Sequence, residues 1–175
     1  DLIFFTKYLI LCKESIKDAQ KYIPDFLDTI VEKNLLCIKN ILTPMDTVPL
    51  FNGGREENLE SFNKFIEDLE YKSKSKKKII GGIHKLNFKN DIIYFDAGNP
   101  PKKSYSKSYQ SGPLSFEYYL DGKKIVTNCG FGSNISPKAE LLSRLTSAQS
   151  TLTINDTSVT KFERNKIVNK IFGNS

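Results

Sequence analysis

The sequence is poor in the side chains that metal and thiol chemistry require. It contains one histidine, His84, and three cysteines, Cys12, Cys37 and Cys129, which have no CxxC spacing. A zinc finger or a Cys-His metal site cannot be assembled from this set alone, and an odd cysteine count argues against a disulfide scaffold. There is also no Gly-rich phosphate loop, no nucleophile elbow and no internal repeat. We therefore expect neither a metal nor another cofactor.

Long apolar runs are absent as well. The longest, from Tyr8 to Cys12, is far shorter than the roughly 20 residues of a spanning helix, so we expect no membrane insertion. The chain begins at Asp1 without the basic leader, apolar stretch and cleavage site of a signal peptide. We interpret it as a fragment or a processed chain. Its 175 residues are enough to bury a core in one domain, or in one domain and part of another.

Positive charge is in excess. Lysine and arginine number 26 against 20 aspartates and glutamates, and much of the excess lies in the run KSKSKKK (72–78) and at Lys102, Lys103 and Lys107. A basic run can bind nucleic acid, anionic lipid or an acidic polysaccharide, and it can equally be a solvated linker. Charge alone identifies no partner.

Apolar residues recur at helical spacing up to about residue 70. They fall into three groups: Phe5, Leu9, Cys12 and Ile16; then Phe26, Ile30, Leu35, Ile38 and Leu42; then Leu59, Phe62, Phe65, Ile66 and Leu69. This spacing predicts three amphipathic helices. Pro24 suits the first turn of the second helix, and Glu56 and Glu57 suit the opening of the third.

The period changes beyond the lysine run. Segments 78–88, 91–98, 114–126 and 150–156 are short, rich in β-branched and aromatic residues, and separated by turn residues, and Asp121-Gly122 is a strong hairpin signal. This pattern predicts an antiparallel β-sandwich. We expect four apolar side chains to share its core, namely Leu114, Phe116, Ile125 and Leu152. The domain boundary is placed near residue 72.

Five blocks of sequence resemble the heparinase II/III-like family of polysaccharide lyases: PLFNGG (49–54), YFDAGNPP (94–101), GPLSFEYYL (112–120), KIVTNCG (124–130) and SRLTSAQSTLTINDTS (143–158). The resemblance implies an α+β fold, in which residues 1–72 are the end of an α/α toroid and residues 73–175 an incomplete antiparallel β-sandwich. It also implies a carbon-oxygen lyase that cleaves uronate-containing polysaccharides by β-elimination. The implied partner is an acidic polysaccharide and not nucleic acid, and the implied location is the bacterial periplasm or cell envelope.

The chain departs from the family where metal ligands and proton carriers are expected. Members often carry an HxHxD pattern before the LSFE strand, where this chain has Ser108, Gln110 and Gly112. Asn128 replaces an acidic ligand, and Gln149 replaces a histidine. An amide cannot shuttle a proton near neutral pH and is a poor zinc ligand. We therefore expect no zinc at these positions.

Five residues are candidates for substrate binding. The amides of Gln110, Asn128 and Gln149 either converge as a sugar-binding or turn-holding cluster, or each satisfies nearby backbone groups. Arg144 suits bidentate recognition of a uronate carboxylate, with a structural salt bridge as the alternative. Tyr105 is a candidate for stacking on a sugar ring, or for a lid over the core.

Two residues are candidates for proton transfer. His84 has the one side chain type that titrates near neutral pH without perturbation, although a lone histidine in a strand is also a packing residue. Tyr109 offers a phenolic acid, or again a lid. Two functions follow as hypotheses. One is a lyase whose acid and base lie upstream or in Tyr109 and His84; the alternative is a non-catalytic relative that binds anionic glycans or serves as structure.

Overall fold

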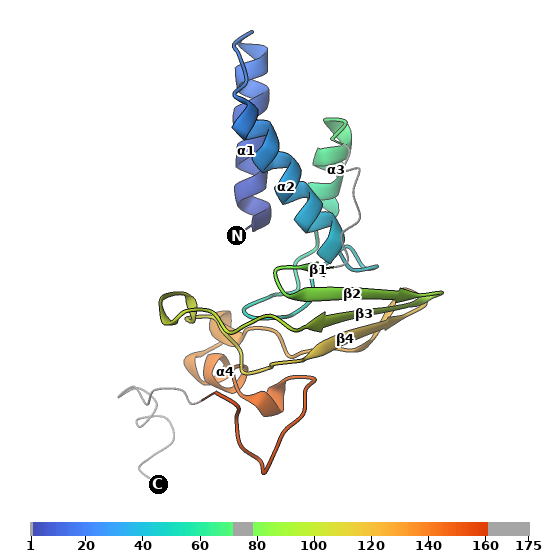
Figure 1. The fold of residues 1–175 in the computed structure, drawn as a ribbon, viewed down its shortest axis with the longest axis vertical. Coiled ribbons are helices and arrows are strands. Elements are labelled where there is room, and N and C mark those ends of the chain that lie inside the picture. Colours follow the sequence, from blue (N-terminus) through green and yellow to red (C-terminus); the bar gives the residue numbers. More distant parts are fainter. Residues whose placement is uncertain (1, 72–78, 161–175) are drawn as a thin grey trace.

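The computed structural model describes residues 2–71 and 79–160. Helices form the N-terminal part and an antiparallel sheet forms the C-terminal part (Figure 1), which confirms the predicted α+β order. The lysine run and the predicted boundary lie outside the described residues. No helix of the described part is both long and apolar enough to span a bilayer.

Three helices pack together beside the sheet. Helix α1 (Leu2–Asp18) lies along α2 (Asp25–Ile41), and α3 (Glu60–Asp68) packs on the same core (Figure 1). Seven buried side chains form that core: Ile10, Leu27, Val31, Leu35, Ile38, Phe62 and Ile66.

The helices are confirmed, but part of the predicted inward stripe is wrong. Phe5 and Phe26 are 54% and 65% exposed, whereas their neighbours Thr6 and Leu27 are buried. Both helices carry apolar residues at adjacent positions, so spacing alone does not select the inward face. Helix α3 also begins later than predicted, at Glu60, whose backbone N–H donates to Asn58 Oδ1 at 2.7 Å.

The sheet is a meander of five antiparallel strands in chain order. Its strands are β1 (Ile79–Ile80), β2 (Ile83–Phe88), β3 (Asp91–Asp96), β4 (Phe116–Leu120) and β5 (Lys123–Val126). Asp121 and Gly122 turn the β4–β5 hairpin with positive φ angles of 49° and 77°, as the sequence predicts. The strand predicted over 150–156 is wrong, because that segment contains only an isolated bridge between Ile154 and Thr157.

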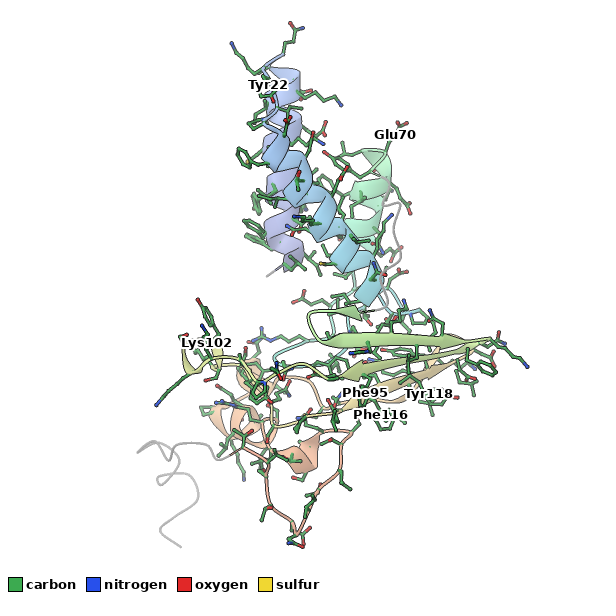
Figure 2. The ribbon with its side chains drawn as sticks, viewed as in Figure 1. Tyr22, Glu70, Phe95, Lys102, Phe116 and Tyr118 are labelled. Atoms are coloured by element: carbon green, nitrogen blue, oxygen red, sulfur yellow. The ribbon has the colours of Figure 1, made fainter. Side chains whose placement is uncertain are left out.

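The two faces of the sheet differ sharply. The inner face, toward the helices, buries Tyr94 and Tyr119 against Phe51 from the segment between α2 and α3. On the outer face lie Phe95, Phe116 and Tyr118 (Figure 2). Among the described residues no second sheet covers this outer face.

The predicted sandwich core is wrong in its choice of side chains. Leu114, Phe116, Ile125 and Leu152 are 58%, 36%, 55% and 75% exposed. Side chains alternate between faces along a strand, and in β4 the alternate set, which includes Glu117 and Tyr119, points inward. The apolar set of this strand thus faces outward and a partly polar set faces the core.

Candidate functional site

Gln110 joins three segments at the end of the sheet where β3 and β5 finish. Its side chain is 1% exposed. Oε1 accepts from the backbone N–H of Gly53 at 3.0 Å, while Nε2 donates to the carbonyls of Gly130 and Ser143, both at 2.8 Å. These bonds tie the NGG turn, the segment after β5 and the end of α4 (Pro137–Leu142) to one amide.

Gln149 converges on the same place. Its Nε2 donates to the Ser143 carbonyl at 2.7 Å and lies 3.7 Å from the thiol sulfur of Cys129, which Gln110 Nε2 approaches at 4.0 Å. Burial raises the pKa of the Cys129 thiol, and the hydrogen bond from Gln149 partly opposes that shift. Two of the three predicted amides therefore share their acceptors.

Asn128 lies one residue from Cys129 and is also buried, at 1% exposure. Its Oδ1 accepts from the backbone N–H and the hydroxyl of Ser150 at 3.0 and 3.1 Å. Its Nδ2 is buried and has no hydrogen-bond partner among the described residues. We call Gln110, Asn128 and Gln149 the amide cluster. The three amides lie close together in the fold, and each also satisfies hydrogen-bonding groups of neighbouring segments.

The amide cluster does not fit a zinc ion. The Nε2 groups of Gln110 and Gln149 point at a backbone carbonyl as donors, and N–H groups do not ligate a cation. No group of three or more histidine, cysteine, aspartate or glutamate side chains with metal-site spacing occurs in the described ranges. We derive no chemistry through a metal here.

Gly112 and Gln149 fit each other. A Cβ placed on Gly112 would lie 2.8 Å from Gln149 Cγ, closer than real Cβ contacts. Gly112 and Gln149 therefore occupy shared space, and a larger side chain at position 112 would require Gln149 to move.

Arg144 supports the loop that carries Tyr109. Its Nε donates to the Tyr109 carbonyl at 3.0 Å, and Nη2 donates to the Ser106 carbonyl at 3.2 Å. Desolvation by burial lowers the pKa of the guanidinium. Tyr105, in the short 3₁₀ helix Lys103–Tyr105, is 77% exposed, and Lys102 lies on the same projecting loop (Figure 2).

Two functional candidates beside Tyr109 escaped the sequence reasoning. Asp96 is 7% exposed, and its Oδ2 accepts from Asn52 Nδ2 at 2.7 Å. Burial raises the pKa of the Tyr109 phenol, and the negative charge of Asp96 raises it further. Asp96 lies in the block YFDAG and Asn52 in the block NGG. Each block by itself indicates a turn, so the sequence does not predict that the two residues are in contact.

His84 lies apart from this group. It sits in β2 opposite Phe95, on the face of the sheet away from Tyr94. Among the described residues it makes no hydrogen bond to Tyr109 or to the amide cluster. The structure thus brings together Tyr109, Arg144 and the three amides, and does not add His84 to them.

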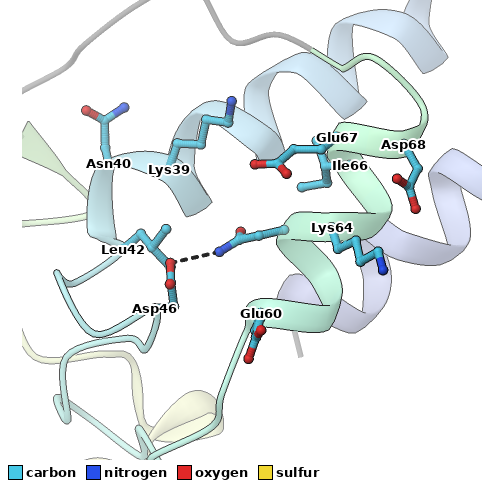
Figure 3. Close-up of a pocket in the computed structure, with 10 residues that line it drawn as sticks. Lys39, Asn40, Leu42, Asp46, Glu60, Lys64, Ile66, Glu67 and Asp68 are labelled. Carbon is cyan, nitrogen blue, oxygen red and sulfur yellow. Dashed lines mark hydrogen bonds between the residues drawn. The ribbon is translucent and has the colours of Figure 1, made fainter.

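A pocket of about 800 Å³ opens elsewhere, between the C-terminal end of α2 and α3 (Figure 3). Four carboxylates line it, together with two lysines: Asp46, Glu60, Glu67 and Asp68, with Lys39 and Lys64. Two of its lining residues are joined by a hydrogen bond, which Asn63 Nδ2 donates to Asp46 Oδ1 at 3.0 Å. An excess of carboxylates disfavours an acidic polysaccharide there.

Comparisons with known proteins agree with the sequence resemblance. Residues 78–172 match the family model described as heparinase II/III-like, C-terminal. Among solved structures, a mutant of the heparan sulfate lyase HepC from Pedobacter heparinus aligns with a TM-score of 0.70 at 15% identity, over 90% of this chain and 29% of that chain. Heparinase III aligns with a TM-score of 0.60 at 14% identity, over 91% of this chain and 32% of that one.

The likeness to solved structures shows the fold of the matched part. The chain spans about three tenths of the length of those two proteins. No curated protein matches the sequence.

Proposed function

Because this chain belongs to the heparinase II/III-like family, we propose that it forms part of a polysaccharide lyase that holds an acidic, uronate-containing polysaccharide and cleaves it by β-elimination. The observation that carries the proposal is the position of Tyr109. Its loop is held by Arg144, its phenol lies near the charge of Asp96, and the amide cluster begins at the next residue.

β-Elimination needs a base and an acid. The base takes the proton from the carbon α to the uronate carboxylate, the electron pair forms a carbon-carbon double bond, and the acid protonates the leaving glycosidic oxygen. With its pKa raised above the ordinary value of about 10, Tyr109 keeps its proton at neutral pH. A protonated phenol can serve as the acid, and the raised pKa makes it a weaker one than an unperturbed tyrosine. The amide cluster supplies no base, and His84, the one imidazole in the sequence, lies in β2 apart from Tyr109.

The surroundings of Tyr109 supply positive charge for an anionic ligand. Lys102 and Lys107 are exposed on the same loop, and Tyr105 offers an exposed ring for stacking on a sugar. A polysaccharide with one carboxylate per uronate matches this lysine-bearing loop better than it matches the acidic pocket of Figure 3. We propose that nucleic acid is not a partner of this protein.

The family also suggests the wider setting. HepC and heparinase III are far longer than this chain. We propose that α1 to α3 are the end of an α/α toroid, that the sheet is part of a β-sandwich, and that the protein works in the bacterial periplasm or cell envelope. The packing of three helices beside the sheet supports this arrangement.

A second candidate function is a non-catalytic glycan-binding relative. It is favoured by the amide cluster, which bonds backbone groups of neighbouring segments and contains no group able to carry a proton near neutral pH. In both functions the protein binds the same polysaccharide, and only in the first does it cleave that polysaccharide.

The test measures binding and cleavage separately. Heparan sulfate and an unsulfated uronate polymer are added to the protein, and the unsaturated uronate product is followed by its ultraviolet absorbance. We expect product with the parent, and for Tyr109→Phe a rate at least about 100-fold lower, the usual contribution of a general acid, with affinity changed less than twofold. Binding without product supports the non-catalytic relative. Absence of binding at low salt contradicts both.

A further inference from the structure

We infer that Asn52 is a ligand-binding residue that forms hydrogen bonds with a hydroxyl group of the polysaccharide, and that Asp96 is its positioning residue. The inference rests on the proposed function, because it names a further contact of the same site. It is carried by the backbone of Asn52, by its bond to Asp96 and by the place of its turn.

Asn52 adopts a backbone conformation that L residues avoid. Its φ is 45°, in the left-handed region, and it is exposed to solvent. Glycine adopts this conformation without a Cβ penalty, and asparagine is the residue that tolerates it best among the others. A turn that needed only the backbone would be served better by glycine. Asn155 shares this conformation and exposure, and what distinguishes Asn52 is the hydrogen bond of its side chain to Asp96.

Asp96 fixes the orientation of the Asn52 amide. A carboxylate accepts hydrogen bonds and does not donate them, so the amide must turn its Nδ2 toward Asp96. The backbone N–H of Gly98 holds the other oxygen of Asp96 at 3.0 Å. Within the described part of the chain, Asp96 is the one side-chain partner of Asn52. Its Oδ1 and second N–H are thus directed away from the carboxylate, on an exposed turn.

The turn places Asn52 next to the site. The neighbouring Gly53 donates its backbone N–H to Gln110 Oε1 at 3.0 Å. A Cβ on Gly53 would lie 2.8 Å from Ser108 Cβ, so the NGG turn packs directly on the residue before Tyr109. The same Asp96 carboxylate that holds Asn52 also acts on the Tyr109 phenol.

The charge of Asp96 selects the group that Asn52 can take. A uronate carboxylate would be repelled by Asp96, whereas a neutral hydroxyl can donate to Oδ1 and accept from the free N–H. The carboxylate of the ligand would instead face Lys102 and Lys107 on the loop. Asn52 therefore recognises the hydroxyl face of a sugar unit.

The experiment compares Asn52→Gly with the parent in calorimetric titrations of a heparan sulfate oligosaccharide at low salt. Glycine relieves the backbone but leaves the buried Asp96 carboxylate without its Asn52 donor, so thermal stability is expected to fall modestly. The folded variant should bind about 5- to 150-fold more weakly, the range for a lost pair of hydrogen bonds. Asn155→Gly is the matched control, because Asn155 is also exposed with a φ of 51°. It should bind like the parent.

Asp96→Asn tests the positioning role through a double-mutant cycle. The single variant should weaken binding several-fold, and combining it with Asn52→Gly should add little to the loss caused by Asn52→Gly alone. Full additivity contradicts the positioning role. If the parent binds and Asn52→Gly binds equally well, Asn52 serves only the turn and the inference is overturned while the proposed function stands. If the parent does not bind, both are overturned.

Discussion

The hydroxyl of Tyr94 donates a 2.6 Å hydrogen bond to the carbonyl of Leu42, the C-cap residue of α2. Lys85 Nζ donates to the same oxygen at 3.2 Å. The last carbonyls of a helix have no partner within the helix, so a donor from the sheet satisfies one of them. One side chain of the sheet core thus fastens the helical part to the sheet.

Tyr94→Phe removes that donor and keeps the ring. We expect the free energy of unfolding to fall by about 1 kcal/mol, the usual net value of one hydrogen bond, because Lys85 still serves Leu42. Urea denaturation measures the change. A loss above about 3 kcal/mol would show that the hydroxyl does more than join the two parts.

Alkaline pH should destabilise the protein through Tyr119. Burial raises its pKa, and the nearby Glu117 charge and hydrogen bond raise it further. A folded pKa above the unfolded value of about 10 means that the stabilisation is fully present below that pH and is lost as pH rises toward the folded pKa. Denaturation midpoints measured above pH 10 should fall less steeply for Tyr119→Phe than for the parent. Equal slopes would contradict this assignment.

The two faces of β4 should respond differently to truncation. Tyr119 is fully buried, so Tyr119→Ala is expected to cost about 3 to 5 kcal/mol. Phe116, on the outer face, is 36% exposed, and Phe116→Ala is expected to cost about 1 kcal/mol. Chemical denaturation of both variants gives the comparison, and a larger loss at Phe116 would show that the outer face is covered in solution.

Gly112 and Gln149 should show coupled effects. Gly112→Ala forces the new Cβ against Gln149 and should destabilise by about 1 to 3 kcal/mol, as overpacking does. Gln149→Ala removes the atom it meets, so the double variant should recover part of that loss. Thermal unfolding of the two single variants and the double variant tests this, and simple additivity would contradict the shared space.

Zinc should not contribute to stability. Gln110 and Gln149 present N–H donors to a backbone carbonyl, and amides are poor zinc ligands. We expect metal analysis of the purified protein to find well under one equivalent of zinc, and treatment with a chelator to leave the unfolding temperature unchanged. One equivalent of zinc, or a clear fall in that temperature, would require ligands other than the amide cluster.

Local pattern predicts the elements of this fold better than their packing. The three helices and the β4–β5 hairpin follow from residue spacing and from Asp121-Gly122, both of which act over a few residues. The inward face of β4 does not, because buried Glu117 accepts the backbone N–H of Leu50 at 3.1 Å, 67 residues away. A carboxylate that accepts such hydrogen bonds can be buried. Because the donor is far away in the sequence, no local pattern predicts that burial.

The candidate site, like the fold, is predicted only in part by the sequence. Gln110, Asn128 and Gln149 were found from motifs that resemble the family, and the structure brings Gln110 and Gln149 onto the same carbonyl. The Asn52–Asp96 pair joins a turn in the helical part to the end of a strand 44 residues later. Each block alone indicates only a turn, and their contact depends on how the NGG segment crosses the sheet.

That crossing decides how the protein can be divided. The segment that holds Phe51, Asn52 and Gly53 precedes residue 72, yet it supplies an aromatic ring to the sheet core and a donor to Gln110. A recombinant piece starting at residue 73 would keep the five described strands and would still lose Phe51 from its core and the Gly53 donor from the proposed binding site. The smallest piece worth expressing therefore starts before Pro49, within the helical part.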